Sequence, residues 1–476
     1  MKKINKSKKQ SENESIDYII PIIFILSILV PIIIASSQQY IVQYGDDVVV
    51  IGWAKDHSVF DIFTTKLGTG YRPVMNLFYV VGYSLWGNNA AGYYLLDGLF
   101  LASGMIFLYL LGKTLHSKLA GIISVGLYLS LDATFILVEK INFLVTTGEI
   151  FFITSALYYS IKYINTKDKN SGILAIILST LAFLTKELSI LIIPTVILTY
   201  LYCKKQLNKQ YILLCVVPFL YLFIVMFFIA PDVGSGNTNI FQRIINNLQF
   251  YINTEMDTQF KTPFLLILSF LIATYYYSYN KLKTEISLCF MWIIVGIAPL
   301  LITQQPVQPT YLAEMNLGVV LLMGIIISES FKKIDIITVL IIIGILAQIS
   351  IIPMQISGMQ NYNRMISDNQ NTFYDSIREL NTIPYNSTAY YIPDNVRQKY
   401  GGYQLTEDFF RKYLCLINDC RNTKITTNYT EANYIILPSS LDIQIFQKEY
   451  STEINKLQLI KQIQHGNDYG LILKKV

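Results

Sequence analysis

The sequence predicts an α-helical polytopic membrane protein, with about eleven transmembrane helices of roughly 20 residues each and a small C-terminal α/β domain. Three observations lead to this fold class. Of the 476 residues, 53% are apolar and only 14% are charged, whereas soluble proteins usually contain about 25% charged residues. Apolar runs long enough to cross a bilayer recur along the first three-quarters of the chain. After Pro353 the sequence becomes polar and no spanning run remains.

The expected transmembrane domain covers residues 1–353. Its first span, near residues 18–36, follows a basic tail. It is too long for the apolar core of a signal peptide, and it lacks a cleavage site of small residues. We therefore expect a retained helix. The other expected spans lie at 91–112, 119–137, 144–162, 172–185, 188–203, 211–230, 263–280, 286–303, 312–330 and 335–352.

The lysine residues predict the orientation of these spans. They gather in alternate connections, so the positive-inside rule places the amino terminus in the cytoplasm. An odd number of spans then places the region after Pro353 outside. A long outer loop, 37–90, follows the first span. Its segment 73–86 is apolar but short, and we interpret it as a helix lying on the outer membrane surface.

Residues 354–476 are predicted to form the soluble α/β domain on the outer face. Short strands are expected at 388–392, 434–437 and 471–474, and helices at 372–380 and 406–414. This region contains Cys415 and Cys420, the only cysteines outside the expected spans. Two thiols at this spacing form a disulfide in an oxidising compartment or remain free, and the sequence leaves both alternatives open.

The motifs of soluble enzymes are absent from this chain. It has no His-Glu-x-x-His helix, no phosphate-binding glycine loop and no Gly-x-Ser-x-Gly elbow. Three histidines in the whole chain disfavour a histidine-rich metal site. The net charge of +5 lies in short loops, so it reflects membrane topology and not nucleic-acid binding. Any chemistry must therefore use carboxylates, lysine, arginine and aromatic side chains.

Four groups of polar residues fall on the predicted outer side. They are Asp46, Asp47, Asp56, His57, Asp61 and Arg72 in the first loop; Asp132, Glu139 and Lys140; Lys186 and Glu187; and Tyr311 with Glu314. The pair Asp46-Asp47 stands directly after the first span, at a hydrocarbon boundary where charge is costly and usually functional. The alternative is a turn-forming aspartate pair after a helix.

Lys186-Glu187 lies between two apolar runs that leave almost no loop. A charged pair in this position is expected to face a water-filled cavity or a partner group. We expect Glu187 to supply the anion beside Lys186 in the resting protein. The alternative is a tight helical hairpin whose two charges only mark the membrane interface.

Several segments, taken in order, resemble the GT-C glycosyltransferases, and within them the protein O-mannosyltransferase and dolichyl-phosphate-mannose-dependent group. These segments are the acidic pair, Tyr71-Arg72-Pro73-Val74, Gly92-Tyr93-Tyr94-Leu95-Leu96-Asp97, Glu139 and Leu184-Thr185-Lys186-Glu187. The resemblance covers residues 18–205, and its ordered set of segments is more specific than any single one. Asp97 departs from the pattern, which has Asn or His there.

The resemblance implies transfer of a sugar from a polyprenyl-phosphate donor to a protein, lipid or glycan acceptor on the outer face. It implies that Asp46 or Asp47 is the catalytic base and that Lys186 or Arg72 binds the donor phosphate. The supporting residues would be Glu187, Glu139, His57 and Tyr311. Some members of this superfamily use a divalent metal ion and others do not, so the metal dependence stays open, as do the sugar, the acceptor and the carrier.

Two other classes of protein remain as alternatives. A transporter or flippase of lipid-linked sugars would also place charges inside a membrane, although we find no internal repeat or paired broken helices. A non-catalytic assembly factor is the second alternative. Within the same transfer chemistry, an oligosaccharide ligase is an alternative enzyme. All are multi-pass proteins, of the plasma membrane in a prokaryote or of the endoplasmic reticulum in a eukaryote.

Overall fold

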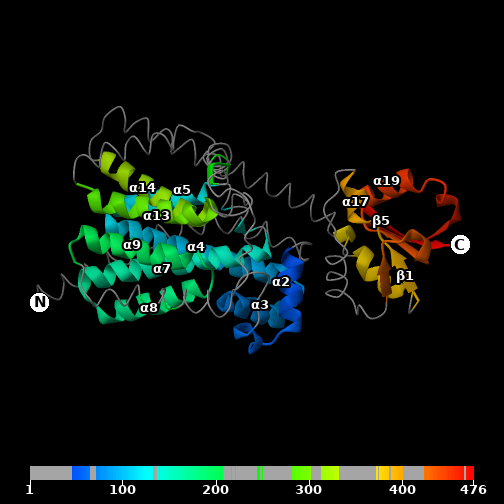
Figure 1. Cartoon of the computed structure of the whole chain (residues 1–476), viewed down its shortest axis with the longest axis horizontal. Coiled ribbons are helices and arrows are strands. Elements are labelled where there is room, and N and C mark those ends of the chain that lie inside the picture. Colours follow the sequence, from blue (N-terminus) through cyan, green and yellow to red (C-terminus); the bar gives the residue numbers. More distant parts are fainter. Residues whose placement is uncertain are drawn as a thin grey trace, which may run out of the picture.

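Figure 1 shows a computed structural model of the whole chain. The structure describes residues 46–64, 71–131, 140–206, 281–301, 312–331, 371–399 without 374, 385 and 386, 423–465 and 468–476, and a few isolated positions between these ranges. The spans predicted at 18–36, 211–230, 263–280 and 335–352 lie outside these ranges. The predicted helix 406–414 and the cysteines Cys415 and Cys420 also lie outside them.

Most of the described chain forms long helices that lie side by side in Figure 1. They are α4 (Ala90–Leu115), α5 (Lys118–Leu129), α7 (Leu144–Thr166), α8 (Lys169–Phe183), α9 (Ser189–Cys203), α13 (Lys283–Leu301) and α14 (Ala313–Ser330). Each overlaps a span predicted from the sequence. Among the described residues, Ala90–Leu115, Ile141–Thr166 and Ala313–Ser330 are long and apolar enough to cross a membrane.

Polar caps set the ends of several helices. The side chains of Asn89, Ser117 and Asp168 accept backbone N–H groups at the starts of α4, α5 and α8. The expectation of one span over 119–137 was wrong at its end, because α5 stops at Leu129. The hydroxyls of Ser130 and Thr134 donate to the carbonyls of Leu127 and Tyr128. Such local bonds compete with helical ones, and this explains why the helix ends.

The core lies between α4 and α7, with α5 and α14 packed together and α9 against α13. Small residues allow the closest approaches. At the corner between α4 and α5, a Cβ atom on Gly112 would lie 2.7 Å from the Cα atom of Gly121. Small residues at helix contacts let two backbones approach closely in membrane proteins.

Shorter elements gather at one end of these helices, where Figure 1 shows α2 and α3. They are α2 (Asp46–Asp56), the short helix η1 (Asp61–Phe63), α3 (Pro73–Trp86) and the turn η2 (Ile141–Phe143). Pro73 at the first position of α3 favours helix initiation there. The N–H of Val74 donates to the carbonyl of Leu184 at 3.2 Å. This bond fixes the start of α3 to the end of α8.

The C-terminal unit contains a five-stranded sheet in the order β2-β1-β3-β5-β4. Its strands are β1 (Ser387–Tyr390), β2 (Thr423–Thr426), β3 (Tyr434–Leu437), β4 (Leu457–His465) and β5 (Asp468–Lys475). Strand β1 pairs in parallel with β2 and β3, whereas β5 pairs antiparallel with β3 and β4. The strands predicted at 388–392, 434–437 and 471–474 are therefore confirmed as β1, β3 and β5.

Helical segments accompany this sheet, and they include the residues predicted as a helix near 372–380. The assigned elements are η6 (Glu379–Thr382), α17 (Asp394–Gln398), η7 (Tyr429–Glu431), α19 (Ser440–Glu449) and η8 (Ile454–Lys456). Ile435, Leu437 and Phe446 form part of the unit's buried core. In Figure 1 the unit lies beyond the end of the helices that carries α2 and α3.

Candidate functional site

Asp47 is the first acid of the predicted site whose side chain the structure describes. It lies in α2, and its carboxylate accepts the backbone N–H groups of Ile141 at 3.0 Å and Asn142 at 2.8 Å. Only 2% of its surface is exposed. The hydroxyl of Tyr79, from α3, lies 3.2 Å from the carbonyl oxygen of Ile141. Asp47 in α2 therefore binds backbone N–H groups of η2, and Tyr79 in α3 binds one of its carbonyl oxygens.

Asp46 is the first residue of α2. Its side chain lies outside what the structure describes, so its position follows only from its place in the helix. Because Asp47 is the next residue, its two bonds to η2 fix the backbone that carries Asp46.

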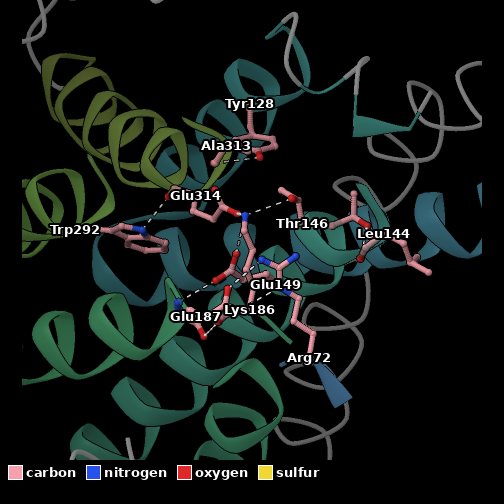
Figure 2. A network of polar contacts seen from close by, with 12 residues as sticks. Arg72, Tyr128, Leu144, Thr146, Glu149, Lys186, Glu187, Trp292, Ala313 and Glu314 are labelled. Atoms are coloured by element: carbon pink, nitrogen blue, oxygen red, sulfur yellow. Dashed lines mark hydrogen bonds and ion pairs between the residues drawn. The ribbon is translucent and has the colours of Figure 1, made fainter. Parts of the chain in front are cut away.

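Lys186 lies in the break between α8 and α9, as predicted. Figure 2 shows its ammonium group among side chains from two other helices. Lys186 Nζ lies 3.3 Å from Glu149 Oε2 of α7 and donates to Glu314 of α14. It also donates to the Thr146 hydroxyl at 3.3 Å. Lys186 and both glutamates are buried, so this charged cluster joins three parts of the helical unit below its surface.

Further hydrogen bonds orient the two glutamates. The backbone N–H of Ser189, at the start of α9, donates to Glu149 Oε1 at 2.8 Å. The Trp292 indole N–H donates to the backbone carbonyl of Glu314 at 2.9 Å, which fixes the start of α14 against α13. Buried charges are tolerated when they are paired and hydrogen-bonded, and these contacts meet part of that need.

Glu187 does not lie beside Lys186, so the sequence-based expectation for this pair was wrong. Instead, Glu187 forms an ion pair with Arg72, with 3.1 Å between Arg72 Nη2 and Glu187 Oε2 and 3.4 Å between Nε and Oε1. The reason is geometric: neighbouring residues in a helical or turn segment project in different directions. Lys186 points into the helical unit, whereas Glu187 faces the start of α3.

Arg72 and Lys186 differ in their access to solvent. The side chains of Arg72 and Glu187 are 31% and 47% exposed, whereas that of Lys186 is 9% exposed. In Figure 2 the Arg72 side chain extends toward Lys186 and Glu149. The structure thus brings together the two cations predicted to bind phosphate, but it leaves Arg72 as the more accessible one.

Asp97, the residue that departs from the family pattern, is buried in α4. The hydroxyl of Thr147 in α7 donates to its Oδ1 atom, and no described residue forms a hydrogen bond with Oδ2. Asp97 interacts electrostatically with Asp47 and Tyr79. These three buried polar residues therefore lie near one another beneath the first loop.

The other predicted supporting residues are not brought into this cluster by the described contacts. His57 Nδ1 lies 2.7 Å from the carbonyl oxygen of Trp53, and the two rings stack at 4.4 Å. Nearby, partial burial raises the pKa of Tyr71, whose hydroxyl donates to the Phe63 carbonyl. Glu139 and Tyr311 lie outside the described residues.

Sequence reasoning did not select Glu149, although it is a central member of the cluster. It falls inside the predicted span 144–162, where a carboxylate within an apolar run is itself a sign of a functional or paired charge. Glu314 was noticed only as a loop residue, whereas it lies in the first turn of α14. Within the described ranges, no group of three metal-ligating side chains comes together; in the cluster, Lys186 itself supplies the cation between the two glutamates.

Known proteins resemble this chain in part of the sequence and in the fold. Residues 71–233 match the family model of the dolichyl-phosphate-mannose-protein mannosyltransferases, which is about a third of the chain and includes Arg72 and Lys186. Among curated proteins, none matches the sequence. The fold matches that of ArnT from Cupriavidus metallidurans bound to undecaprenyl phosphate, with a TM-score of 0.55 and 10% identity over 95% of this chain and 98% of that one.

The chain therefore has the fold of the membrane protein ArnT, and about a third of it matches a glycosyltransferase family. Apo ArnT also matches, with a TM-score of 0.54, 10% identity and coverage of 95% of this chain and 97% of that one. The oligosaccharyltransferase of Archaeoglobus fulgidus matches with a TM-score of 0.49 and 12% identity over 86% of this chain and 65% of that one. The resemblance to GT-C glycosyltransferases, predicted from the sequence, is confirmed, and the enzyme is favoured over the transporter and assembly-factor alternatives.

Proposed function

We propose that this glycosyltransferase moves a sugar from a polyprenyl-phosphate donor to a hydroxyl group of a protein, lipid or glycan. The matched family is described by a dolichyl-phosphate-mannose donor and a protein acceptor, and the ArnT structure contains undecaprenyl phosphate. The observation that carries the proposal is the partly exposed Arg72–Glu187 pair beside the buried cluster, at the end of the helices where α2 begins. A phosphate oxygen would replace the Glu187 carboxylate on Arg72.

Arg72 is the residue that we assign to the donor phosphate. When the acceptor oxygen attacks the anomeric carbon, the bond between that carbon and the phosphate oxygen breaks and the carrier phosphate keeps the electron pair. The leaving phosphate gains negative charge, which a guanidinium stabilises through two parallel hydrogen bonds. Glu187 already engages both Arg72 Nε and Nη2 in this forked manner, so the arginine is oriented for an anion.

Lys186 is assigned a positioning role. Its ammonium already faces two buried carboxylates, Glu149 and Glu314. A phosphate could reach Lys186 only by displacing a buried carboxyl group from the ammonium, which is unfavourable in a poorly solvated site. We therefore propose that Lys186 holds α7, α14 and the hairpin between α8 and α9 in place, while Arg72 contacts the donor.

Asp46 is our candidate for the catalytic base, which accepts the proton of the acceptor hydroxyl. Both carboxylate oxygens of Asp47 accept backbone N–H groups in a buried position, so they are poorly placed to reach the hydroxyl of an acceptor. Asp47 is thus better suited to hold the first loop on η2. His57, Glu139 and Tyr311 remain proposed supporting residues.

The orientation in the membrane is part of the same proposal. The amino terminus lies in the cytoplasm, and residues 354–476 form an extracytoplasmic domain on the side of Asp46. The alternating lysine distribution supports this orientation, as does the location of the C-terminal unit beyond the end of the helices that carries α2 and α3. The boundary between residues 353 and 354 lies outside the described ranges and stays a prediction.

Binding of the carrier tests the proposal directly. The purified protein in detergent is heated with and without a short-chain polyprenyl phosphate, and the shift of the unfolding midpoint Tm is measured. A ligand that binds only the native state raises Tm. We expect a rise for the wild type and for Lys169→Ala, an exposed control, and a much smaller rise for Arg72→Ala. No shift for the wild type at millimolar ligand would contradict the proposed donor.

A further inference from the structure

The turn between α2 and α3 exposes an unusual amount of aromatic surface. Phe60 directly precedes η1 and Phe63 is its last residue, and they are 88% and 62% exposed. Val59 beside them is exposed as well. Between them, Ile62 is buried against the protein. Single exposed apolar residues are common on protein surfaces, but several within one short turn usually mark a contact with another apolar phase.

The turn is a compact structure that presents these rings outward. Asp61 Oδ2 accepts both the backbone N–H and the hydroxyl of Ser58, each at 2.7 Å. The hydroxyl of Tyr71 donates to the Phe63 carbonyl at 3.2 Å, which connects the end of η1 to the residue before Arg72. These bonds satisfy the polar groups locally, so the rings are exposed on a defined turn.

Exposed apolar side chains continue from this turn along the chain into a candidate membrane span. Helix α3, which packs against η1, exposes Val81 and Leu85 one turn apart on a single face. Helix α4 follows after three residues and exposes Leu95 and Leu99, also one turn apart. Helix α4 is long and apolar enough to cross the bilayer, so we expect its exposed leucines to face lipid.

We propose that Phe60 and Phe63 insert into the bilayer leaflet on the side of α2 and α3, and that η1 anchors the first loop at the membrane surface. The continuity of exposed apolar side chains from α4 through α3 to η1 identifies lipid as the occupant. Lys55 and Asp56, immediately before the turn, are exposed, and they would remain at the level of the polar headgroups. Apolar rings below charged groups are typical of segments that lie in the membrane interface.

The anchor has a consequence for the site. Tyr71 links η1 to the start of α3, and Arg72 is the next residue. Insertion of η1 would therefore hold Arg72 at a fixed depth, near the boundary where the headgroup of a membrane lipid lies. This inference concerns contact with bilayer lipid, and it does not depend on which sugar donor the enzyme uses.

Photo-crosslinking of the full chain in lipid nanodiscs tests this inference. The photoreactive amino acid p-benzoylphenylalanine is placed at Phe60 or at Phe63, and at Leu459 as a matched control. Leu459 is also apolar and 53% exposed, but it lies on strand β4 of the C-terminal unit. After irradiation, mass spectrometry of the intact protein and its peptides identifies the crosslinked partner.

We expect phospholipid adducts at positions 60 and 63, joined through an acyl-chain carbon, and at least tenfold less lipid adduct at position 459. Adducts mainly with a second copy of the chain would overturn the inference, because the patch would then be a protein contact. The absence of lipid adducts at both positions would overturn it as well. The unfolding midpoint Tm of the same substituted proteins, compared with the wild type, confirms that they are folded.

Discussion

The two cations of the site differ most clearly in how their charge is compensated. Lys186 contacts two buried carboxylates, whereas Arg72 contacts one carboxylate that is itself 47% exposed. Exposed ion pairs contribute little free energy, about 0–1 kcal/mol, so an arriving anion can displace Glu187 from Arg72. The same displacement at Lys186 would have to break a buried cluster.

Arg72 is therefore expected to affect chemistry more than folding. Arg72→Ala should lower kcat/KM roughly 10²–10³-fold, the usual loss for one preorganised contact to a developing anion. Arg72→Lys should recover part of the activity, because it keeps the charge but loses the forked geometry. Glu187→Gln is the matched control and should be milder. Steady-state kinetics with a short-chain polyprenyl-phosphate sugar measure these values, and normal kinetics for Arg72→Ala would refute the assignment.

The two neighbouring aspartates should behave differently when each is changed to asparagine. Asp46→Asn should lower kcat by about 10²–10⁴-fold, the usual contribution of a general base, with little change in Tm. Asp47→Asn should lower stability by roughly 1–3 kcal/mol, because an amide cannot accept both N–H groups of η2. Thermal unfolding and single-turnover transfer distinguish the two effects. A stable, inactive Asp47→Asn protein beside an active Asp46→Asn protein would reverse our assignment.

The sequence indicated the two cations of the site but not which carboxylates pair with them. Adjacency suggested Glu187 as the partner of Lys186, but the fold brings Glu149 and Glu314 there from distant parts of the chain. Lys186 could be selected from the sequence, since a charge between two apolar runs is conspicuous, and Arg72 could be selected because it lies in a segment that resembles the family. Their partners could not, because pairing depends on how the helices pack.

At the scale of elements, the buried cluster acts between helices. Glu149 belongs to α7 and Glu314 to α14, and Lys186 lies between α8 and α9. The N–H of Ser189, at the start of α9, bonds to Glu149 as well. The charge of Lys186 thus keeps four helices in register near the end that carries Arg72.

Removing this charge should cost stability. Lys186→Met should lower the free energy of unfolding by about 3–5 kcal/mol, the usual result of leaving a buried charge without its partner. The double variant Lys186→Met/Glu314→Gln should recover part of the loss, because one carboxylate is neutralised. Lys169→Met, at an exposed position, is the control and should change little. Tm in detergent is the measurement, and an unchanged Tm for Lys186→Met would contradict the positioning role.

Helices were easier to predict than their ends. Long apolar runs predicted α4, α7, α8, α9, α13 and α14, because a bilayer demands apolar length. The end of α5 was missed, since it depends on hydroxyl groups that bond to local carbonyls. Strands β2 and β4 were also missed, because β2 has only four residues and β4 is mostly exposed and lacks a buried apolar face.

In the whole molecule, the first loop and the C-terminal unit are proposed to lie on one side of the membrane. In a cysteine-free background, Asp56→Cys and Gln447→Cys should react with an impermeant maleimide added outside intact cells. Lys169→Cys, on a predicted cytoplasmic connection, should react only after the cells are opened. All three positions are exposed. If Gln447→Cys, like Lys169→Cys, reacted only after the cells are opened, a span would have been miscounted.

We propose above all that this membrane protein breaks the bond between a sugar and a polyprenyl phosphate. Proteoliposomes containing the purified protein are given a short-chain polyprenyl-phosphate sugar, labelled in the sugar, with a membrane extract as the source of acceptor. We predict that the label leaves the lipid donor and becomes attached to an acceptor, and that Asp46→Asn and Arg72→Ala greatly slow this loss. A donor that stays intact with every sugar tested, or that crosses the bilayer uncleaved, would contradict the claim.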